Sequence, residues 1–172
     1  MSFNVYFDAK RFNNKVYLGV QIYEQGSKFE PYVTDLEVLE GATFLEDQLE
    51  AFLLALEIVE EEEFDDVILM NQNKILFDWL FKNNHESVLR ESYYTQIKGK
   101  MSNIATNFGK IGTKVIQGNK NEAKKEIKKS LKNQETEVQD FTDMFRMETE
   151  DKEKEQDKKG KNNVVRINRR AN

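Results

Sequence analysis

The chain has 172 residues, of which 38% are hydrophobic and 33% charged, and this balance predicts one domain together with a segment outside any packed core. The formal net charge of −5 argues against a general nucleic-acid binder. The chain has no cysteine, which excludes disulfides and thiolate metal sites and favours a reducing, cytoplasmic location, and no apolar run approaches the ~18 residues of a membrane span.

Three strand-like runs come first in the chain. Residues 3–8 and 15–24 alternate between apolar and polar side chains, and a third run covers 28–38. Short turns at 11–14 and 24–27 join them, which predicts an antiparallel meander. Pro31 lacks a ladder donor, so it favours an edge position or a bulge in the third strand.

After the third strand-like run, the spacing of the apolar residues changes from that of a strand to that of a helix. Apolar residues at helical spacing predict a helix over 43–61, followed by a short buried strand at 67–71 that pairs in parallel. Two further helices are expected over 73–83 and 86–108, where Trp79 is assigned to the core. A fifth strand is expected at 113–117.

The last predicted helix covers 119–132, capped by either Asn119 or Asn121. The predicted order is β-β-β-α-β-α-α-β-α, a five-stranded mixed α/β sheet with helices packed on it, over a domain at 1–133. Residues 134–172 are nearly all charged in their centre and predict a disordered tail.

Charge is distributed unevenly along the sequence. Residues 110–132 hold eight lysines against two glutamates, so a basic segment follows an acidic body. This segment predicts a phosphate-binding track, although a lysine-rich amphipathic helix is also explained by solubility alone. The residues predicted to bind nucleic acid are Lys110, Lys114, Lys120, Lys124, Lys125 and Lys128.

Several strings resemble the type-1 ribonuclease H family. VYFDAK (5–10) is similar to its first strand, YLGVQIY (17–23) to its second, QLEAFLLALE (48–57) to its first helix, and KVIQGNKNEAKKEI (114–127) to its fifth strand and last helix. The resemblance covers about residues 1–132 and implies the ribonuclease H fold. It also implies a site in which four carboxylates hold two divalent ions that cleave a phosphodiester.

Only one of the four implied carboxylates is present. Asp8 matches the first, Gln48 and Asn71 stand at the second and third, and the fourth falls on Lys124 or Lys125. The histidine that the family carries before its last helix is missing, since the lone His85 lies elsewhere. Glu50 is about 200° around the helix from Gln48 and is expected on another side.

The catalytic positions Asp8, Gln48 and Asn71 are therefore interpreted as vestigial, with no bound metal or cofactor expected. One hypothesis is a pseudoenzyme that keeps the fold and associates with RNA–DNA hybrid or structured RNA. The alternative is a ribonuclease that cleaves the RNA strand of RNA–DNA hybrids with magnesium or manganese through a rearranged site, in which a shifted helix register would make Glu46 or Glu50 a ligand.

A further hypothesis is a protein-interaction module that binds a partner through its tail. Residues 138–147 place Phe141, Met144 and Phe145 at the spacing of a short docking helix. Folding back onto the same chain is the alternative. The sequence shows no phosphate-cradling glycine loop and no nucleophile paired with a histidine.

Overall fold

The computed structural model describes residues 2–80 and 88–134. The chain divides into two units, Met1–Ile127 and Lys128–Asn172, and every strand of the described residues lies in the first. Of the second unit the structure describes 128–134, the end of a helix. The predicted tail beyond this point and its docking helix at 138–147 lie outside the described residues, as does His85, and the boundary at 133 stays a prediction.

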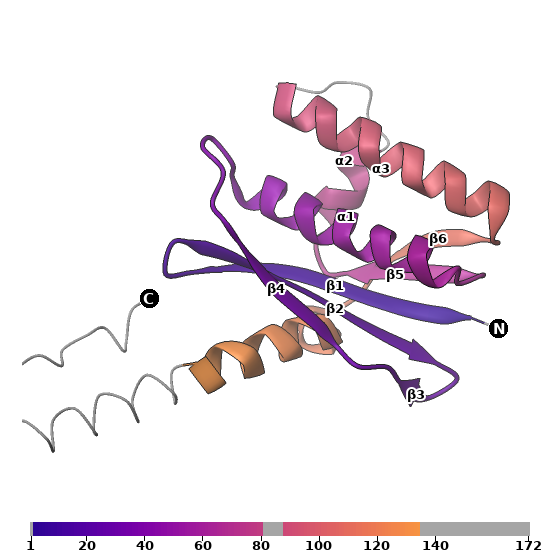
Figure 1. Ribbon diagram of the computed structural model, residues 1–172, viewed down its shortest axis with the longest axis horizontal. Helices are drawn as coiled ribbons and strands as arrows, with labels where there is room; N and C mark the ends of the chain where they lie inside the picture. Colours follow the sequence, from indigo (N-terminus) through magenta and orange to yellow (C-terminus); the bar gives the residue numbers. More distant parts are fainter. Residues whose placement is uncertain (1, 81–87, 135–172) are drawn as a thin grey trace, which may run out of the picture. The chain divides into compact units, whose positions relative to one another are not determined.

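The first unit is built on one mixed sheet (Figure 1). Its order is β3-β2-β1-β5-β6, with β4 also paired to β2. The pairs β1–β2 and β2–β4 are antiparallel, whereas β1–β5 and β5–β6 are parallel, so the predicted meander leading into parallel strands is confirmed. The strands are β1 (Phe3–Phe12), β2 (Lys15–Glu24), β3 (Ser27–Lys28), β4 (Tyr32–Glu37), β5 (Val67–Asn71) and β6 (Ile111–Val115).

The first hairpin is tighter than predicted. Asn13 and Asn14 have φ angles of 53° and 63°, the left-handed values that a two-residue hairpin turn requires and that asparagine tolerates. The strands therefore extend to within two residues of each other, and β1 runs to Phe12.

The third predicted strand is divided in two around Pro31, which gives six strands instead of five. Because proline has no N–H to donate, the ladder is interrupted there, and β4 resumes at Tyr32. Strand β6 begins two residues earlier than predicted, because its parallel register with β5 pairs Ile111 with Val67.

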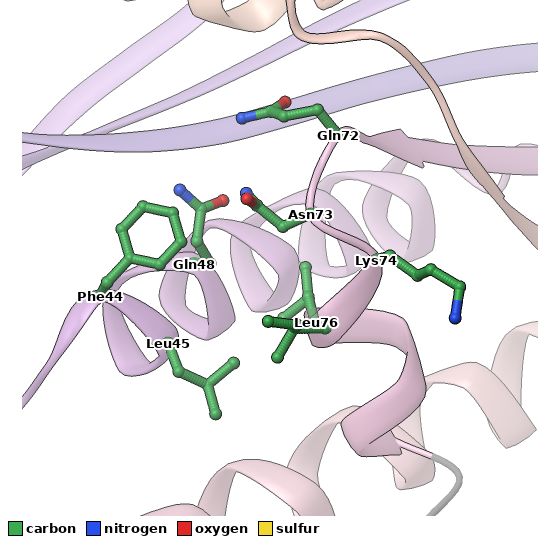
Figure 2. A pocket seen from close by; sticks show the side chains of 8 residues that line it. Phe44, Leu45, Gln48, Gln72, Asn73, Lys74 and Leu76 are labelled. Atoms are coloured by element: carbon green, nitrogen blue, oxygen red, sulfur yellow. The ribbon is translucent and has the colours of Figure 1, made fainter.

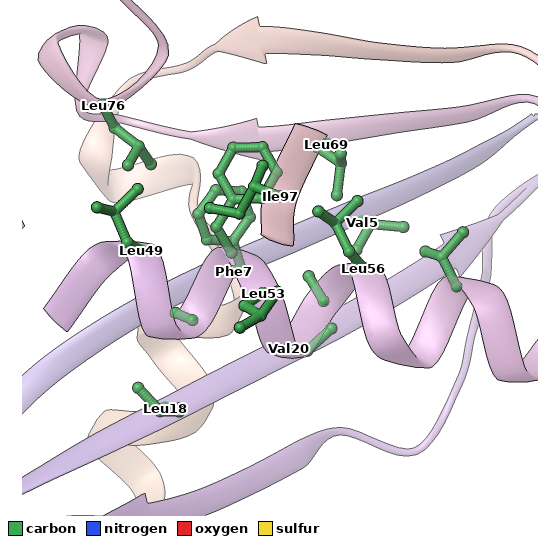
Figure 3. Close-up of a cluster of buried hydrophobic side chains, with 14 of the residues drawn as sticks. Val5, Phe7, Leu18, Val20, Leu49, Leu53, Leu56, Leu69, Leu76 and Ile97 are labelled. Carbon is green, nitrogen blue, oxygen red and sulfur yellow. The ribbon is translucent and has the colours of Figure 1, made fainter. Parts of the chain in front are cut away.

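Three helices pack against one face of the sheet (Figure 1). They are α1 (Phe44–Glu62), α2 (Lys74–Leu80) and α3 (Val88–Asn107). Fully buried side chains of α1, such as Phe52 and Leu56, meet Phe7 and Leu69 from the strands in one core (Figure 3). Trp79 is buried against Tyr94, as predicted for a core residue.

A further helix, 122–134, begins in the first unit and contacts β2 at Gly19. A Cβ on Gly19 would lie 2.7 Å from Cγ1 of Ile127 and 3.1 Å from the carbonyl oxygen of Ala123. Only glycine permits this approach. Of the two predicted caps the structure uses Asn121, whose Oδ1 accepts the N–H of Ala123 at 3.0 Å. No helix in the described ranges is both long and apolar enough to cross a membrane.

Candidate functional site

The site lies where β1 and β5 stop pairing. Their parallel ladder ends at Tyr6 and Met70, so the carbonyl of Phe7 lies beyond the last paired residues. Two side-chain amides satisfy it instead: Asn71 donates Nδ2–H at 2.8 Å and Asn121 donates Nδ2–H at 3.0 Å. The carboxyl end of a parallel strand in an open α/β sheet is where ligands usually bind.

Five side chains form a chain of hydrogen bonds at this point, whose two ends both donate to the carbonyl of Phe7, and we call it the amide network. Gln48 Nε2 donates to Asp8 Oδ1 at 2.9 Å, and Gln72 Nε2 donates to the same oxygen at 3.2 Å. Asn71 donates to Gln48 Oε1 at 3.1 Å, and Asn121 donates to Gln72 Oε1 at 2.7 Å. The network joins β1, α1, the end of β5 and the cap of helix 122–134, and its members are Asp8, Gln48, Asn71, Gln72 and Asn121.

Asp8 is the only carboxyl group of this network, and just 4% of the residue is exposed. Burial raises its pKa above the ordinary 3.8, although the amides of Gln48 and Gln72 and the ammonium of Lys124 oppose this effect. The network thus holds an ionisable group in surroundings that disfavour its charged form.

The predicted positions Asp8, Gln48 and Asn71 lie together in the amide network. Gln48 is 1% exposed and Asn71 fully buried. Glu50 faces elsewhere, as predicted, and accepts a hydrogen bond from the hydroxyl of Tyr93 on α3 at 2.5 Å. Glu46, the other candidate for a shifted register, binds Thr43 and Arg90, not the network.

Lys124 and Lys125, the two residues that could match the fourth carboxylate of the family, lie in different surroundings. Lys124 lies close enough to Asp8 to influence its charge, whereas Lys125 makes an ion pair with Glu122 at 2.9 Å. A Cβ on Gly118 would lie 3.5 Å from Lys124 Nζ and 3.7 Å from Gln72 Cγ, so both side chains flank Gly118.

Two members of the network were not predicted as site residues. Gln72 follows the third position directly, and Asn121 was named only as a possible cap. The available signal was a run of amides, Asn71, Gln72 and Asn73, immediately after a buried strand. Such a run places several side-chain donors and acceptors at the carboxyl end of a strand, where ligands usually bind.

The oxygen atoms that the amide network could offer as metal ligands do not fit a pair of divalent cations. Such ions need oxygen ligands with most of the attraction from anionic ones. Here the one carboxylate already receives two amide N–H groups and lies near an ammonium. Across residues 2–80 and 88–134, no three His, Cys, Asp or Glu side chains gather where they could hold a metal ion.

The predicted lysines are all exposed, but they occupy different places. Lys110 precedes edge strand β6 and Lys114 lies within it, Lys120 ends the short 3-10 helix Gly118–Lys120, and Lys124 borders the network. Lys128 is the first residue of the second unit, so nothing places it relative to the site.

A cavity of about 300 Å³ opens beside the network, between the first turn of α1 and the start of α2 (Figure 2). Its wall is mostly apolar, with three amide side chains on one side. It is lined by Phe44, Leu45, Gln48, Gln72, Asn73, Lys74, Ile75 and Leu76.

Solved structures share this architecture. The ribonuclease H1 of the halophilic archaeon Halobacterium salinarum matches with a TM-score of 0.60 and 16% identity, over 72% of this chain and 91% of that protein. The fold is ribonuclease H-like. LC11-RNase H1, isolated from compost by a metagenomic approach and solved in complex with an RNA/DNA hybrid, matches with a TM-score of 0.57 and 17% identity, over 70% of this chain and 89% of its own.

A third ribonuclease H-like match is the N-terminal ribonuclease H domain of a Mycobacterium tuberculosis protein, with a TM-score of 0.56 and 12% identity over 70% of this chain and 85% of that one. No family model matches the sequence, and no curated protein matches it either. At identities of this order the likeness concerns the fold.

Proposed function

We propose that this chain is a nucleic-acid-associated ribonuclease H-like module that binds RNA–DNA hybrid or structured RNA without cleaving it. One observation carries the proposal: the only carboxylate of the amide network, Asp8, receives two amide N–H groups on one oxygen. The fold supports an association with nucleic acid, because a neighbour of the same fold was solved with an RNA/DNA hybrid.

The absence of cleavage follows from charge. Metal-assisted phosphodiester hydrolysis needs two cations held by several anionic oxygens. An amide offers a neutral oxygen, and in this network the oxygens of Gln48 and Asn71 are already occupied as acceptors. An ammonium near the site repels a cation by about 4 kcal/mol at 4 Å and an effective dielectric near 20. No cofactor is therefore proposed, and magnesium or manganese would be required only under the nuclease alternative.

The binding surface is proposed to run from β6 to the network. Lys114 and Lys124 are exposed lysines at the two ends of this path, with Lys120 between them in sequence. Lys125 is paired with Glu122 and is therefore proposed to contribute less to phosphate binding. Phosphate contacts of this kind position a nucleic acid without reading its sequence. The proposed compartment is the cytoplasm, in keeping with the absence of cysteine.

A cleavage assay tests the catalytic part. The purified protein is incubated with end-labelled RNA–DNA hybrid in magnesium or manganese, with Asp8→Asn as the matched variant. We expect no cleavage above the level of that variant. Cleavage by the wild type that disappears in Asp8→Asn would establish the nuclease alternative, in which the metal site is rearranged.

A binding assay tests the nucleic-acid part. Band shifts with hybrid, double-stranded RNA and single strands compare the wild type with Lys124→Glu, and Lys98→Glu on α3 carries the same charge change away from the path. We expect only Lys124→Glu to weaken hybrid binding. If no nucleic acid binds, the protein-interaction alternative through Phe141, Met144 and Phe145 is favoured, and a pull-down with and without residues 135–172 tests it.

A further inference from the structure

The cavity beside the amide network has an unusual mouth. Phe44 is 61% exposed and Ile75 74% exposed, the two most exposed of the large apolar side chains in the described ranges. Both line the cavity, one from the first turn of α1 and the other from the first turn of α2. Exposed apolar side chains gathered at one opening mark a binding surface more often than scattered ones do.

The amide side of the cavity has unused hydrogen-bonding capacity. Both N–H groups of Gln48 are used, because its Nε2 donates to Asp8 and to the carbonyl of Ala9, and its Oε1 accepts one hydrogen bond from Asn71. Asn73 uses one N–H, towards Asn71 Oδ1 at 2.9 Å. Within the part of the chain that the structure describes, its second N–H and its Oδ1 have no partner.

These groups surround one space (Figure 2). The Phe44 ring and the amides of Gln48, Asn73 and Gln72 lie around the same opening, with Leu76 below them and the Lys74 ammonium turned away. Lys74 is instead paired with Asp78 at 2.9 Å. The opening thus combines an aromatic face, an amide with a free donor and a free acceptor, and apolar walls.

That combination matches a nucleobase. Bases stack on aromatic side chains, and an asparagine amide that presents one donor and one acceptor complements the edge of adenine. Lys124 Nζ and Gln72 Cγ both lie within 4 Å of the point that a Cβ on Gly118 would occupy, and Gln72 lines the cavity. A lysine ammonium in that neighbourhood is suited to the phosphate attached to a base held in the cavity.

We propose that this cavity receives one unpaired base, preferably adenine, from single-stranded nucleic acid. The inference rests on the proposed function and narrows its partner. A base inside a duplex is stacked on both faces and paired along one edge, so it cannot present a face to Phe44 and an edge to Asn73 together. Single strands, loops and overhangs can.

Fluorescence anisotropy with a labelled adenine decamer, a pyrimidine decamer and a blunt RNA–DNA hybrid tests the inference on the full chain. We expect Phe44→Ala to weaken binding of the adenine decamer about tenfold or more, as loss of one stacked base does. Phe44→Trp should keep the affinity, and Asn73→Ala should reduce the preference for adenine. Hybrid binding should not change with Phe44→Ala. Tyr32→Ala, which removes another exposed aromatic on β4, is the matched control.

The outcomes separate the two proposals. If the hybrid binds and the adenine decamer is insensitive to Phe44→Ala, the cavity does not take a base, while the proposed function stands. If no nucleic acid binds at all, both fail. Sedimentation of the wild type and Phe44→Ala adds a last outcome: self-association that this substitution abolishes would assign the cavity to a second copy of the chain and overturn the inference.

Discussion

Asp8 shows how a single buried carboxyl group responds to neutral neighbours. Its oxygen receives two amide N–H groups, yet burial raises its pKa above 3.8, because removal from water outweighs what neutral donors and a nearby lysine return. A bound metal ion would favour the charged form of Asp8, which is the single anion of the amide network.

A pH prediction follows for Asp8→Asn. A raised pKa means that the folded protein binds more protons than the unfolded chain just above pH 3.8, so the wild type loses stability as pH rises through that window. Asp8→Asn has no carboxyl group to titrate at this position, so it does not lose stability in this way. We therefore expect the free energy of unfolding of the variant to rise relative to that of the wild type between acid and neutral pH. The rise should be about 1.4 kcal/mol for each unit by which folding raises the pKa of Asp8.

Urea unfolding over a pH series measures this difference. Asp78→Asn, which removes an exposed carboxylate paired with Lys74, is the control and should not show the rise. A difference that stays flat, or falls with pH, would show that Asp8 is not held in unfavourable surroundings.

At the residue level, the resemblance to the type-1 ribonuclease H strings placed Gln48 and Asn71, and helix geometry placed Glu50 on another side of the same helix. Asn121 and Gln72 were missed because their role depends on the carbonyl of Phe7, which is available only where β1 and β5 stop pairing. That availability is a property of the sheet, so the run of amides at 71–73 marks the position in the sequence but does not reveal these hydrogen bonds.

Among the elements, α1 is fixed at its start by Glu46. This residue is 3% exposed, accepts the backbone N–H of Thr43 at 2.9 Å and binds Arg90 of α3 at 2.7 Å. Burial opposes its charge, but the hydroxyl and backbone N–H of Thr43 and the Arg90 guanidinium outweigh it and lower the pKa of Glu46 from 4.5 to about 2. The helix start and the α1–α3 contact therefore share one carboxylate.

Glu46→Gln should destabilise the protein with the opposite pH sign to Asp8→Asn. A lowered pKa gives stability that is present above pH 4.5 and is lost as pH falls towards 2. We expect a loss of about 1–3 kcal/mol at neutral pH that shrinks in acid. Urea unfolding at both ends of this range is the measurement. Glu57→Gln on the exposed side of α1 is the control, and a loss that persists unchanged in acid would contradict the role of the charge.

Gly19 sets the distance between β2 and helix 122–134. Because an added Cβ would lie 2.7 Å from Ile127 Cγ1, Gly19→Ala must displace the helix or the isoleucine. Overpacking of this kind costs about 1–3 kcal/mol. If the helix is displaced, Asn121 moves with it, and hydrogen exchange at the N–H of Ala123, which Asn121 Oδ1 accepts, should accelerate.

A double-mutant cycle by thermal unfolding checks the contact. Ile127→Ala removes the atom that clashes, so Gly19→Ala should cost less in that background than in the wild type. Gly112→Ala on β6, where an added Cβ meets nothing within 4 Å, is the control. Equal costs in both backgrounds would mean that the helix does not depend on this approach.

The order of strands and helices was predictable because each change in the spacing of apolar residues along the sequence marks a change of secondary structure. The exceptions have local causes: Pro31 divided one predicted strand, and two asparagines with positive φ shortened a turn. The register of β6 was not predictable, because it depends on pairing with β5 over a long separation in sequence.

On the scale of the whole molecule, charge decides what the chain can bind. The body before Lys110 is acidic, and the lysines that follow are concentrated on β6, the 3-10 turn and helix 122–134. An acidic body repels nucleic acid at long range, so attraction has to come from a few close contacts. This arrangement favours selective binding of particular nucleic acids over general binding of any nucleic acid.

The salt dependence of hybrid binding measures those contacts. Each neutralised phosphate contributes about −0.9 to the slope of log affinity against log salt concentration, so the five predicted lysines of the first unit allow a slope no steeper than about −4.5. Lys124→Glu should make the slope shallower by about 1 and weaken binding uniformly across sequences. Lys98→Glu should leave the slope unchanged. A slope near zero, or one that Lys124→Glu does not alter, would mean that the hybrid does not lie along β6 and the amide network, since any duplex on that path must release counterions where its phosphates meet these ammonium groups.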